Sequence, residues 1–293
     1  MIQRRHFSTA AALAMASPFV LVPTRAQAAS SLPAQLQQLE ASAQGRLGVT
    51  ILDTATGQTH GHRMDERFMM LSSFKLLASA LVLARVDRGQ DSLDRRITYA
   101  KGDLVTWSPV TERFADTAEG MTLGDLCEAT LTTSDNSAAN FILDSYGGPA
   151  ALTRYARELG DNTTRLDRRE TELNTGTAAA LLDTTTPRAM ALTLHKLLLG
   201  NALSPASRER LQQWLVANTT GDKRLRAGLP AGWRVGEKTG TNTTDANDIG
   251  ITWPTHGRAP LIITAYLAES TASSAVKEAT LAGVARLAAS LVA

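Results

Sequence analysis

The sequence predicts an α/β chain of the α+β type, in which both ends build one five-stranded antiparallel sheet around an inserted helical lobe. Segments with strand-like alternation lie near the two ends, at 46–53 and 58–62 and again at 233–240, 247–253 and 259–268. The long segment between them has the apolar spacing and the capping residues of helices. Helical patterns also flank the strands at both ends, and we expect these helices to cover the sheet.

The composition allows two lobes in one chain. The 293 residues are 43% hydrophobic and 20% charged, a balance that can bury two compact cores. We assign residues 29–64 and 217–293 to an α/β lobe formed by both termini, and residues 65–216 to an all-α lobe. Small-molecule sites are common in clefts between such units, so we expect the functional residues at the junction of the lobes.

The first 28 residues have the pattern of an export signal. Arg4 and Arg5 precede an apolar stretch at 10–22, and Ala26-Gln27-Ala28 is a small-x-small cleavage signature. The paired arginines favour the twin-arginine route to the periplasm, with an ordinary secretory signal as the alternative. No apolar stretch is long enough to span a membrane. The leader holds three of the 30 basic residues and none of the 28 acidic ones, so the remainder suggests no nucleic-acid or membrane partner.

The N-terminal elements have clear periods. Residues 32–43 have helical apolar spacing, residues 46–53 alternate as a strand, and a short strand follows at 58–62. His60 and His62 would share one face of that strand. Two histidines without a third ligand are more often a surface pair than a metal site, so we expect no metal and no cofactor.

Capping residues and prolines mark the helices of the central lobe. An apolar helical run begins at Ser72 and reaches about Asp87. Thr122 with Asp125 three residues later has the pattern of a capping box. Three further helices are expected to begin at prolines, which favour the first helical position: Pro149, Pro187 and Pro205.

Residues 161–183 show neither a helical nor a strand period. Structureless segments of this length inside a compact domain are usually functional loops, and we predict one here. A final amphipathic helix is expected over residues 274–292.

Ser72 and Lys75 form a Ser-x-x-Lys pair at the start of the predicted central helix. Residues three apart share a helix face, so the hydroxyl and the amine would lie side by side. This arrangement places a nucleophile beside a base at the positive end of a helix dipole. The pair alone is a weak signal, because Ser274 and Lys277 repeat it in the last helix, where no further motif follows.

Three more short motifs follow the first Ser-x-x-Lys pair. They are Ser-Asp-Asn at 134–136, Glu-Thr-Glu-Leu-Asn at 170–174 and Lys-Thr-Gly at 238–240. With these motifs in this order, the chain after the leader resembles a class A serine β-lactamase. The resemblance implies the two-lobe fold of serine β-lactamases and penicillin-binding transpeptidases. It also implies hydrolysis of the β-lactam ring of penicillins and cephalosporins, which confers resistance.

The resemblance implies catalytic roles for four side chains. Ser72 would be the nucleophile, and either Lys75 or Glu170 would be the base in acylation. Ser134 would pass a proton to the departing ring nitrogen. Glu170 would then act with Asn174 to hold and deprotonate the water that hydrolyses the acyl-enzyme.

The resemblance also implies a set of substrate-binding residues. Asn136 would bind the acylamide of the substrate, and Trp107 matches an aromatic at the cleft mouth, although ordinary packing would also suit it. The backbone N–H groups of Ser72 and Thr241 would form the oxyanion hole. Gly240 lacks a β-carbon and would let the substrate approach. The substrate carboxylate would lie against the segment that starts at the Lys-Thr-Gly motif: Lys238, Thr239, Gly240 and Thr241.

An arginine for the substrate carboxylate has to come from elsewhere in this chain. Many relatives carry one in the strand after the motif, but residues 242–248 contain none. Another branch has an arginine fourteen residues before the motif lysine, and Arg224 stands at that spacing. We therefore predict that Arg224 is the substitute, with Lys223 and Arg226 as rivals and plain surface charge as the alternative.

The Glu170 motif would lie in the Ω-loop of the family, at about 165–183. Arg168 and Asp183 match the ion pair that closes this loop in relatives. Thr171 stands where many relatives have proline after a cis peptide bond, which is expensive without proline. The identity of the loop is therefore better supported than its backbone geometry.

Two other functions occur on this fold, a D-Ala-D-Ala peptidase and a non-hydrolysing penicillin-binding sensor. Both lack a dedicated deacylating carboxylate, so the pairing of Glu170 with Asn174 argues against them. We predict an exported monomer whose only partner is a small β-lactam substrate.

Overall fold

Five antiparallel strands form a sheet that both ends of the chain share. The computed structural model describes Met1 and residues 31–292. The strand order is β2-β1-β9-β8-β7, so the N-terminal strands join the C-terminal strands through β1 and β9. This confirms the predicted five-stranded sheet. The strands are β1 (Arg46–Asp53), β2 (Thr59–His62), β7 (Arg234–Thr241), β8 (Ala246–Trp253) and β9 (Leu261–Ala268).

Apolar packing holds the two ends of the chain in register. Val49 lies opposite Ala265 and Ile51 lies opposite Ile263 in the pairing of β1 with β9. All four side chains are buried in the same core, because alternate residues of paired strands point to the same face. A shift of one residue would turn this set to the other face, so the core fixes the register.

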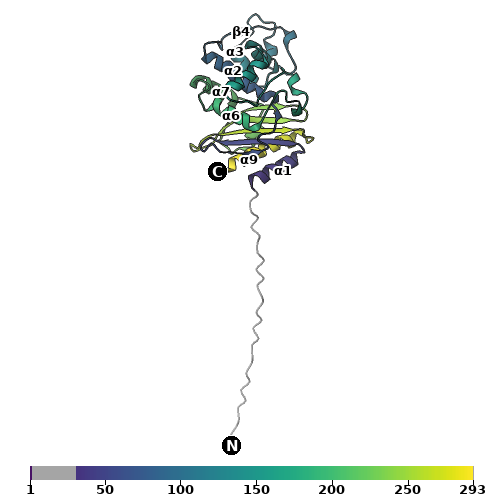
Figure 1. The fold of residues 1–293 in the computed structure, drawn as a ribbon, viewed down its shortest axis with the longest axis vertical. Coiled ribbons are helices and arrows are strands. Elements are labelled where there is room, and N and C mark those ends of the chain that lie inside the picture. Colours follow the sequence, from purple (N-terminus) through teal and green to yellow (C-terminus); the bar gives the residue numbers. More distant parts are fainter. Residues whose placement is uncertain (2–30, 293) are drawn as a thin grey trace. The chain divides into compact units, whose positions relative to one another are not determined.

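Helices cover both faces of the sheet (Figure 1). On one face lie α1 (Leu32–Ala43) and α9 (Ser274–Ser290), with α8 (Leu225–Gly228) packed against α9. The prediction for α1 is correct to the residue, and α9 ends two residues earlier than predicted. The single turn α8 was not predicted, since four residues are too few to show a helical period.

The other face carries the helical lobe, with α2 (Phe74–Asp87) at its centre. Every residue of α2 from Phe74 to Ala84 is buried, as expected of a helix that is apolar on all sides. α6 and α7 contact the sheet directly. The other helices of the lobe are α3 (Leu123–Thr132), α4 (Asn136–Ser145), α5 (Pro149–Glu158), α6 (Pro187–Leu198) and α7 (Pro205–Val216).

The predicted starts of α3, α5, α6 and α7 are confirmed. Thr122 Oγ1 accepts a hydrogen bond from Asp125 N, and the Asp125 carboxylate accepts one from Thr122 N, which completes the capping box. Thr186 and Ser204 cap α6 and α7 immediately before the prolines at the first helical positions. These bonds satisfy backbone donors that the first helical turn leaves free.

Two short strand pairs were not predicted, because two-residue strands show no alternation. β3 (Phe68–Met69) pairs with β6 (Thr184–Thr185), and β4 (Arg96–Ile97) pairs with β5 (Met121–Thr122). The first pair, with a bond from Met70 N to Asp183 O, ties the end of the Ω-loop to the segment before Ser72. The proposed lobe limits at residues 64 and 216 stay a prediction.

The predicted export signal lies outside the described residues. In residues 31–292, no helix is long and apolar enough to cross a membrane. The same part of the chain has no group of three or more His, Cys, Asp or Glu placed to hold a metal. His62 lies 3.1 Å from Glu40 of α1, so its ring pairs with a carboxylate.

Candidate active site

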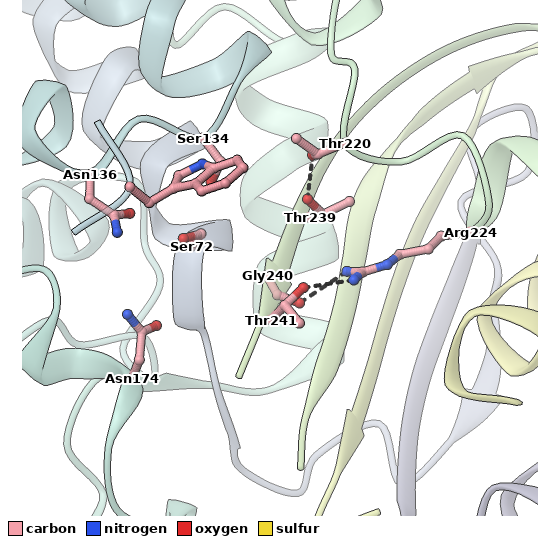
Figure 2. Close-up of a pocket in the computed structure, with 10 residues that line it drawn as sticks. Ser72, Ser134, Asn136, Asn174, Thr220, Arg224, Thr239, Gly240 and Thr241 are labelled. Carbon is pink, nitrogen blue, oxygen red and sulfur yellow. Dashed lines mark hydrogen bonds between the residues drawn. The ribbon is translucent and has the colours of Figure 1, made fainter. Parts of the chain in front are cut away.

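A cavity of about 340 Å³ lies between β7, the edge strand of the sheet, and the helical lobe (Figure 2). It brings together residues from four parts of the chain that were predicted to share a site. Lys75, Glu170 and Lys238 are buried directly beside it. The lining residues are Ser72, Trp107, Ser134, Asn136, Asn174, Thr220, Arg224, Thr239, Gly240 and Thr241.

Ser72 lies in a 3-10 turn, η1 (Leu71–Ser73), that leads directly into α2. The prediction that the α-helix itself begins at Ser72 is therefore wrong by one tight turn. Asn247 of β8 donates hydrogen bonds from Nδ2 to Met69 O and Met70 O and anchors this turn to the sheet. The anchor comes from a residue far along the chain, so local sequence patterns could not reveal the distorted helix start.

Lys75 is completely buried and is the centre of a polar network. Its Nζ donates to Ser72 Oγ at 2.9 Å, to Ser134 O at 2.9 Å and to Asn136 Oδ1 at 2.6 Å. It also forms an ion pair with Glu170 Oε1 at 3.0 Å. Burial lowers the pKa of Lys75, and the negative charge of Glu170 opposes this shift. Lys75 is therefore not an ordinary solvent-exposed helix lysine.

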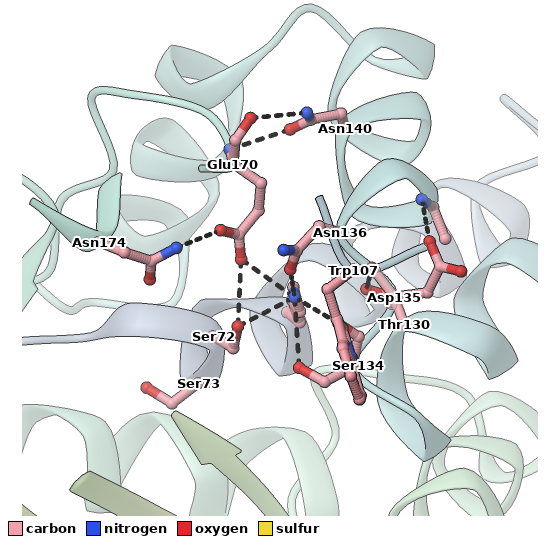
Figure 3. A network of polar contacts seen from close by, with 12 residues as sticks. Ser72, Ser73, Trp107, Thr130, Ser134, Asp135, Asn136, Asn140, Glu170 and Asn174 are labelled. Atoms are coloured by element: carbon pink, nitrogen blue, oxygen red, sulfur yellow. Dashed lines mark hydrogen bonds and ion pairs between the residues drawn. The ribbon is translucent and has the colours of Figure 1, made fainter. Parts of the chain in front are cut away.

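The main chain of Glu170 is clamped so that its carboxylate faces Ser72 (Figure 3). Asn140 donates from Nδ2 to Glu170 O at 2.9 Å and accepts from Glu170 N at 3.0 Å. Ser72 Oγ donates to Glu170 Oε1 at 3.1 Å, and Asn174 Nδ2 donates to Oε2 at 2.6 Å. Asn174 Oδ1 is buried and has no hydrogen-bond partner within residues 31–292. Asn140 was missed, because one asparagine on a helix carries no motif.

The loop that carries Glu170 is closed as the resemblance implied. Arg168 Nε lies 2.6 Å from Asp183 Oδ2, and Asp183 Oδ1 accepts hydrogen bonds from the backbone N–H groups of Asp167 and Arg168. The peptide bond between Glu170 and Thr171 is cis although no proline follows it. The predicted ion pair is confirmed.

Ser134 stands between the two buried lysines. Lys238 Nζ donates to Ser134 Oγ at 3.0 Å, and Lys75 Nζ lies 3.3 Å from the same oxygen. Burial lowers the pKa of Lys238 well below its usual value, and the nearby positive charge of Lys75 adds to the effect. Asp135 accepts hydrogen bonds from the N–H groups of Val110 and Thr111, so its carboxylate holds the turn of the Ser-Asp-Asn motif against this segment.

Arg224 reaches the cavity from the segment before α8. Its side chain is only 7% exposed, so the alternative of plain surface charge is wrong. Nη2 donates to Thr241 Oγ1 at 2.6 Å and Nη1 donates to Gly240 O at 3.0 Å (Figure 2). Of its rivals, Lys223 is exposed and Arg226 pairs with buried Glu237. Neither rival lines the cavity.

Thr220 was not predicted and lies beside the Lys-Thr-Gly segment. The hydroxyls of Thr220 and Thr239 form a hydrogen bond of 2.5 Å. The Thr220 hydroxyl also lies 2.8 Å from Asn218 Oδ1, to which it can donate. The cavity therefore has three threonine hydroxyls on its sheet side, at Thr220, Thr239 and Thr241. Hydroxyls of this kind give small anions hydrogen-bond donors that can rotate to suit them.

The structure gives Gly240 a second physical reason besides the predicted approach of substrate, which stays a prediction. A β-carbon on Gly240 would lie 3.0 Å from Leu71 Cβ and from Met70 O, and 3.2 Å from Ser72 N. The glycine is thus required for β7 to lie against the Ser72 turn. This close approach sets the backbone of β7 beside the backbone of Ser72.

Trp107 stands at the mouth of the cavity. Its side chain is 61% exposed, so packing into a core does not explain it. Its indole Nε1 donates to Thr133 O at 3.0 Å, which holds the ring over the loop before Ser134 (Figure 3). The ring therefore presents an apolar face to the cavity while its polar atom is satisfied.

Comparisons with known proteins agree with this geometry. A family model described as the β-lactamase enzyme family matches residues 31–292. A solved ancestral class A β-lactamase is 57% identical, with a TM-score of 0.87, covering 89% of this chain and 100% of that one. The chain belongs to the class A serine β-lactamase family.

Curated relatives cover nearly the same length. β-Lactamase L2 of Stenotrophomonas maltophilia is 44% identical over an alignment of 301 positions that covers 98% of this chain and 98% of that one. A β-lactamase of Streptomyces lavendulae is 49% identical over 232 residues, 78% of this chain and 76% of that one. As a class A β-lactamase, the protein is a hydrolase that opens the β-lactam ring of small-molecule antibiotics and confers resistance to them.

Proposed function

We propose that this class A β-lactamase hydrolyses penicillins and cephalosporins through an acyl-enzyme on Ser72. One observation carries the proposal: the Glu170 carboxylate is held within hydrogen-bond distance of both Ser72 Oγ and Lys75 Nζ. A serine with two bases nearby can attack the lactam to form an acyl-enzyme, and water activated by a base can then hydrolyse that acyl-enzyme and free the serine. Turnover, rather than permanent acylation, follows from a carboxylate in this position.

In acylation, Ser72 Oγ attacks the lactam carbonyl carbon and gives its proton to a base. Lys75 and Glu170 both lie within reach, and the lowered pKa of Lys75 makes its neutral form accessible. As the ring C–N bond breaks, the nitrogen takes a proton from Ser134, and Lys75 returns to Ser134 the proton that Ser72 released. Ser134 is suited to this step because Lys75 and Lys238 both contact its hydroxyl.

The backbone N–H groups of Ser72 and Thr241 would stabilise the oxyanion that forms on the carbonyl oxygen. The support is that Gly240 lies close to Ser72 N and that Ser72 and Thr241 both line the cavity. Donors fixed in this way need no rearrangement when the negative charge develops.

In deacylation, Glu170 takes a proton from a water molecule whose oxygen attacks the ester carbon. Ser72 Oγ then leaves and regains a proton. Asn174 supports this role, since its Nδ2 holds Glu170 while its Oδ1 stays open to a further donor. Asn140 is a positioning residue that fixes the main chain of Glu170.

The substrate carboxylate would lie against the sheet side of the cavity. Lys238 gives positive charge, and the hydroxyls of Thr239 and Thr241 give hydrogen bonds. Arg224 adds a second positive charge and orients the Thr241 hydroxyl at 2.6 Å. Asn136 would bind the acylamide, and Trp107 would pack against the substrate at the mouth.

The deacylation role is tested by comparing the wild type with Glu170→Ala on a chromogenic cephalosporin. We expect continuous turnover by the wild type, and by the variant a burst followed by a rate lower by about 1,000-fold. Mass spectrometry should show the trapped adduct on Ser72. Glu172→Ala removes an exposed carboxylate two residues away and should behave as the wild type. A wild type that stops after one equivalent would instead identify a peptidase or a sensor.

The carboxylate role of Arg224 is tested with Arg224→Ala and, as a matched control, Lys223→Ala. We expect kcat/KM for penicillins to fall about 10- to 100-fold for the first variant, mostly through KM, since a buried charged contact is lost. The exposed neighbour should have no effect. An unchanged kcat/KM in Arg224→Ala would overturn this role.

We also propose that the chain is exported to the periplasm by the twin-arginine route and works as a monomer. Arg4 and Arg5 before the apolar stretch support the route. The monomer is supported by the cavity, because every residue assigned a role comes from one chain.

A further inference from the structure

A second cavity, of about 390 Å³, lies between α5 and the start of the Ω-loop. It shares no lining residue with the catalytic cavity. Its lining contains three arginines and one carboxylate, Asp167, and no other charged side chain. The arginines are Arg154, Arg157 and Arg165.

The floor of this cavity is one face of α5. Ala150, Thr153, Arg154 and Arg157 follow the i, i+3, i+4, i+7 spacing of a helical stripe. Thr153 Oγ1 donates to Leu166 O at 3.0 Å and accepts from Leu166 N at 2.9 Å, so the loop is fixed to the helix at this point. The small side chains of Ala150 and Thr153 leave room between the guanidinium groups.

The positive charge of the cavity is mostly not neutralised. Arg157 Nη1 donates to the backbone oxygens of Asp161 and Thr164, which orients the guanidinium but leaves its charge unpaired. Arg165 donates from Nε to both carboxylate oxygens of Asp167, so this guanidinium is paired. The exposed side chain of Arg154 forms no hydrogen bond or ion pair with any residue between 31 and 292. Two of the three guanidinium groups thus lack a carboxylate partner there.

We propose that this cavity binds a small tetrahedral oxyanion, phosphate or sulfate. A guanidinium presents two parallel N–H donors that match two oxygens of such an anion. Arg157 is already held in place by backbone oxygens, and Arg154 lies one turn before it on the same face. Because Leu166 and Asp167 lead directly to Glu170, the bound anion ties the start of the Ω-loop to α5.

The test uses phosphate alone, with the ionic strength kept constant by chloride. Thermal unfolding of the wild type should shift upward with phosphate and saturate, since a ligand that binds only the folded state stabilises it. Arg154→Gln should weaken the apparent affinity for phosphate by about tenfold or more. Arg286→Gln is the matched control: it removes an exposed helical arginine of α9, outside both cavities, and should keep the wild-type response.

A second measurement separates the two cavities, because Lys238 and its threonines could also bind phosphate. In the wild type, the arginine side-chain Nε signals of Arg154 and Arg165 should move in nuclear magnetic resonance spectra as phosphate is added. Shifts confined to residues around Ser72, or equal phosphate affinity in Arg154→Gln and Arg286→Gln, would overturn the proposal. This experiment is independent of β-lactam turnover.

Discussion

The chain contains the same Ser-x-x-Lys spacing at the start of two helices, and only the first pair lies at the candidate active site. Ser72 lies in the 3-10 turn just before α2, and Lys75 lies in the first turn of α2. Ser274 and Lys277 both lie in the first turn of α9. Both lysines are buried. Spacing and burial together therefore do not produce a catalytic pair.

The two pairs differ in what the rest of the chain brings to them. Lys75 contacts Ser72, Ser134, Asn136 and Glu170, so its amine is placed between a nucleophile and a carboxylate. Lys277 donates to the backbone oxygen of Thr243 at 2.7 Å, and no ion pair involves it in the described part of the chain. Ser274 is exposed. The chemistry of the motif thus depends on hydroxyl, amide and carboxylate groups supplied by distant loops.

The largest expected effect comes from removing each serine hydroxyl in turn. Ser72→Ala should lower kcat/KM for penicillins by at least about 1,000-fold, because the nucleophile is lost. Ser274→Ala should leave kcat/KM within about twofold of the wild type, as expected for an exposed surface change. Steady-state hydrolysis measures both. Full activity of Ser72→Ala would show that Ser72 is not the nucleophile and that the two Ser-x-x-Lys pairs do not differ in function.

The lysines give the next largest effect. Lys75→Met should lower kcat by about 100- to 10,000-fold, because a proton-transfer group in contact with the nucleophile is removed. Lys277→Met should keep kcat and change the unfolding free energy by about 1 kcal/mol, the size of one hydrogen bond. Kinetics and urea unfolding of both proteins measure this. A loss of kcat in Lys277→Met would show that the α9 pair also serves catalysis.

The smallest expected effect lies on the α1 and α9 side of the sheet and concerns stability alone. Burial would raise the pKa of Glu40, but hydrogen bonds from Arg63, Leu47 N and His62 lower it from 4.5 to about 2. A carboxyl group whose pKa is lowered by folding stabilises the protein above its unfolded pKa, and this contribution is lost as the pH falls toward 2.

Glu40→Gln should therefore be less stable than the wild type by about 2 kcal/mol at pH 7, with unchanged kcat/KM. The difference should shrink as the pH falls below 4.5 toward 2. Urea unfolding at pH 7 and pH 3 measures it. A difference that stays constant over this range would mean that the Glu40 contacts do not stabilise through its charge.

Much of the fold could be predicted because the relevant signals are local. The limits of α1 and β1 follow from apolar period, and the starts of α3, α6 and α7 follow from caps and prolines. The elements that were missed are α8 and the strand pairs β3–β6 and β4–β5. These are one turn or two residues long, so they form through tertiary contacts and leave no period in the sequence.

The candidate site likewise contains residues that local motifs predict and residues that only tertiary contacts reveal. The motif residues were predicted because their spacing is typical of the family, and Arg224 was predicted from its distance to the motif lysine. Asn140, Thr220 and Asn247 were missed, since each acts through hydrogen bonds to a segment distant in the chain. The packing reason for Gly240 was also missed, because it depends on how closely β7 approaches the Ser72 turn.

The sequence by itself determined the helices and strands, the sheet that joins the two ends, and the set of reactive groups. These follow from side-chain periodicity, capping and motif order, which act over a few residues. The tertiary structure decided which groups meet, because it brings Ser72 within hydrogen-bond distance of Glu170, 98 residues away in the chain. It also decided the lowered pKa values of Lys75 and Lys238, since burial and nearby charge depend on the packed fold.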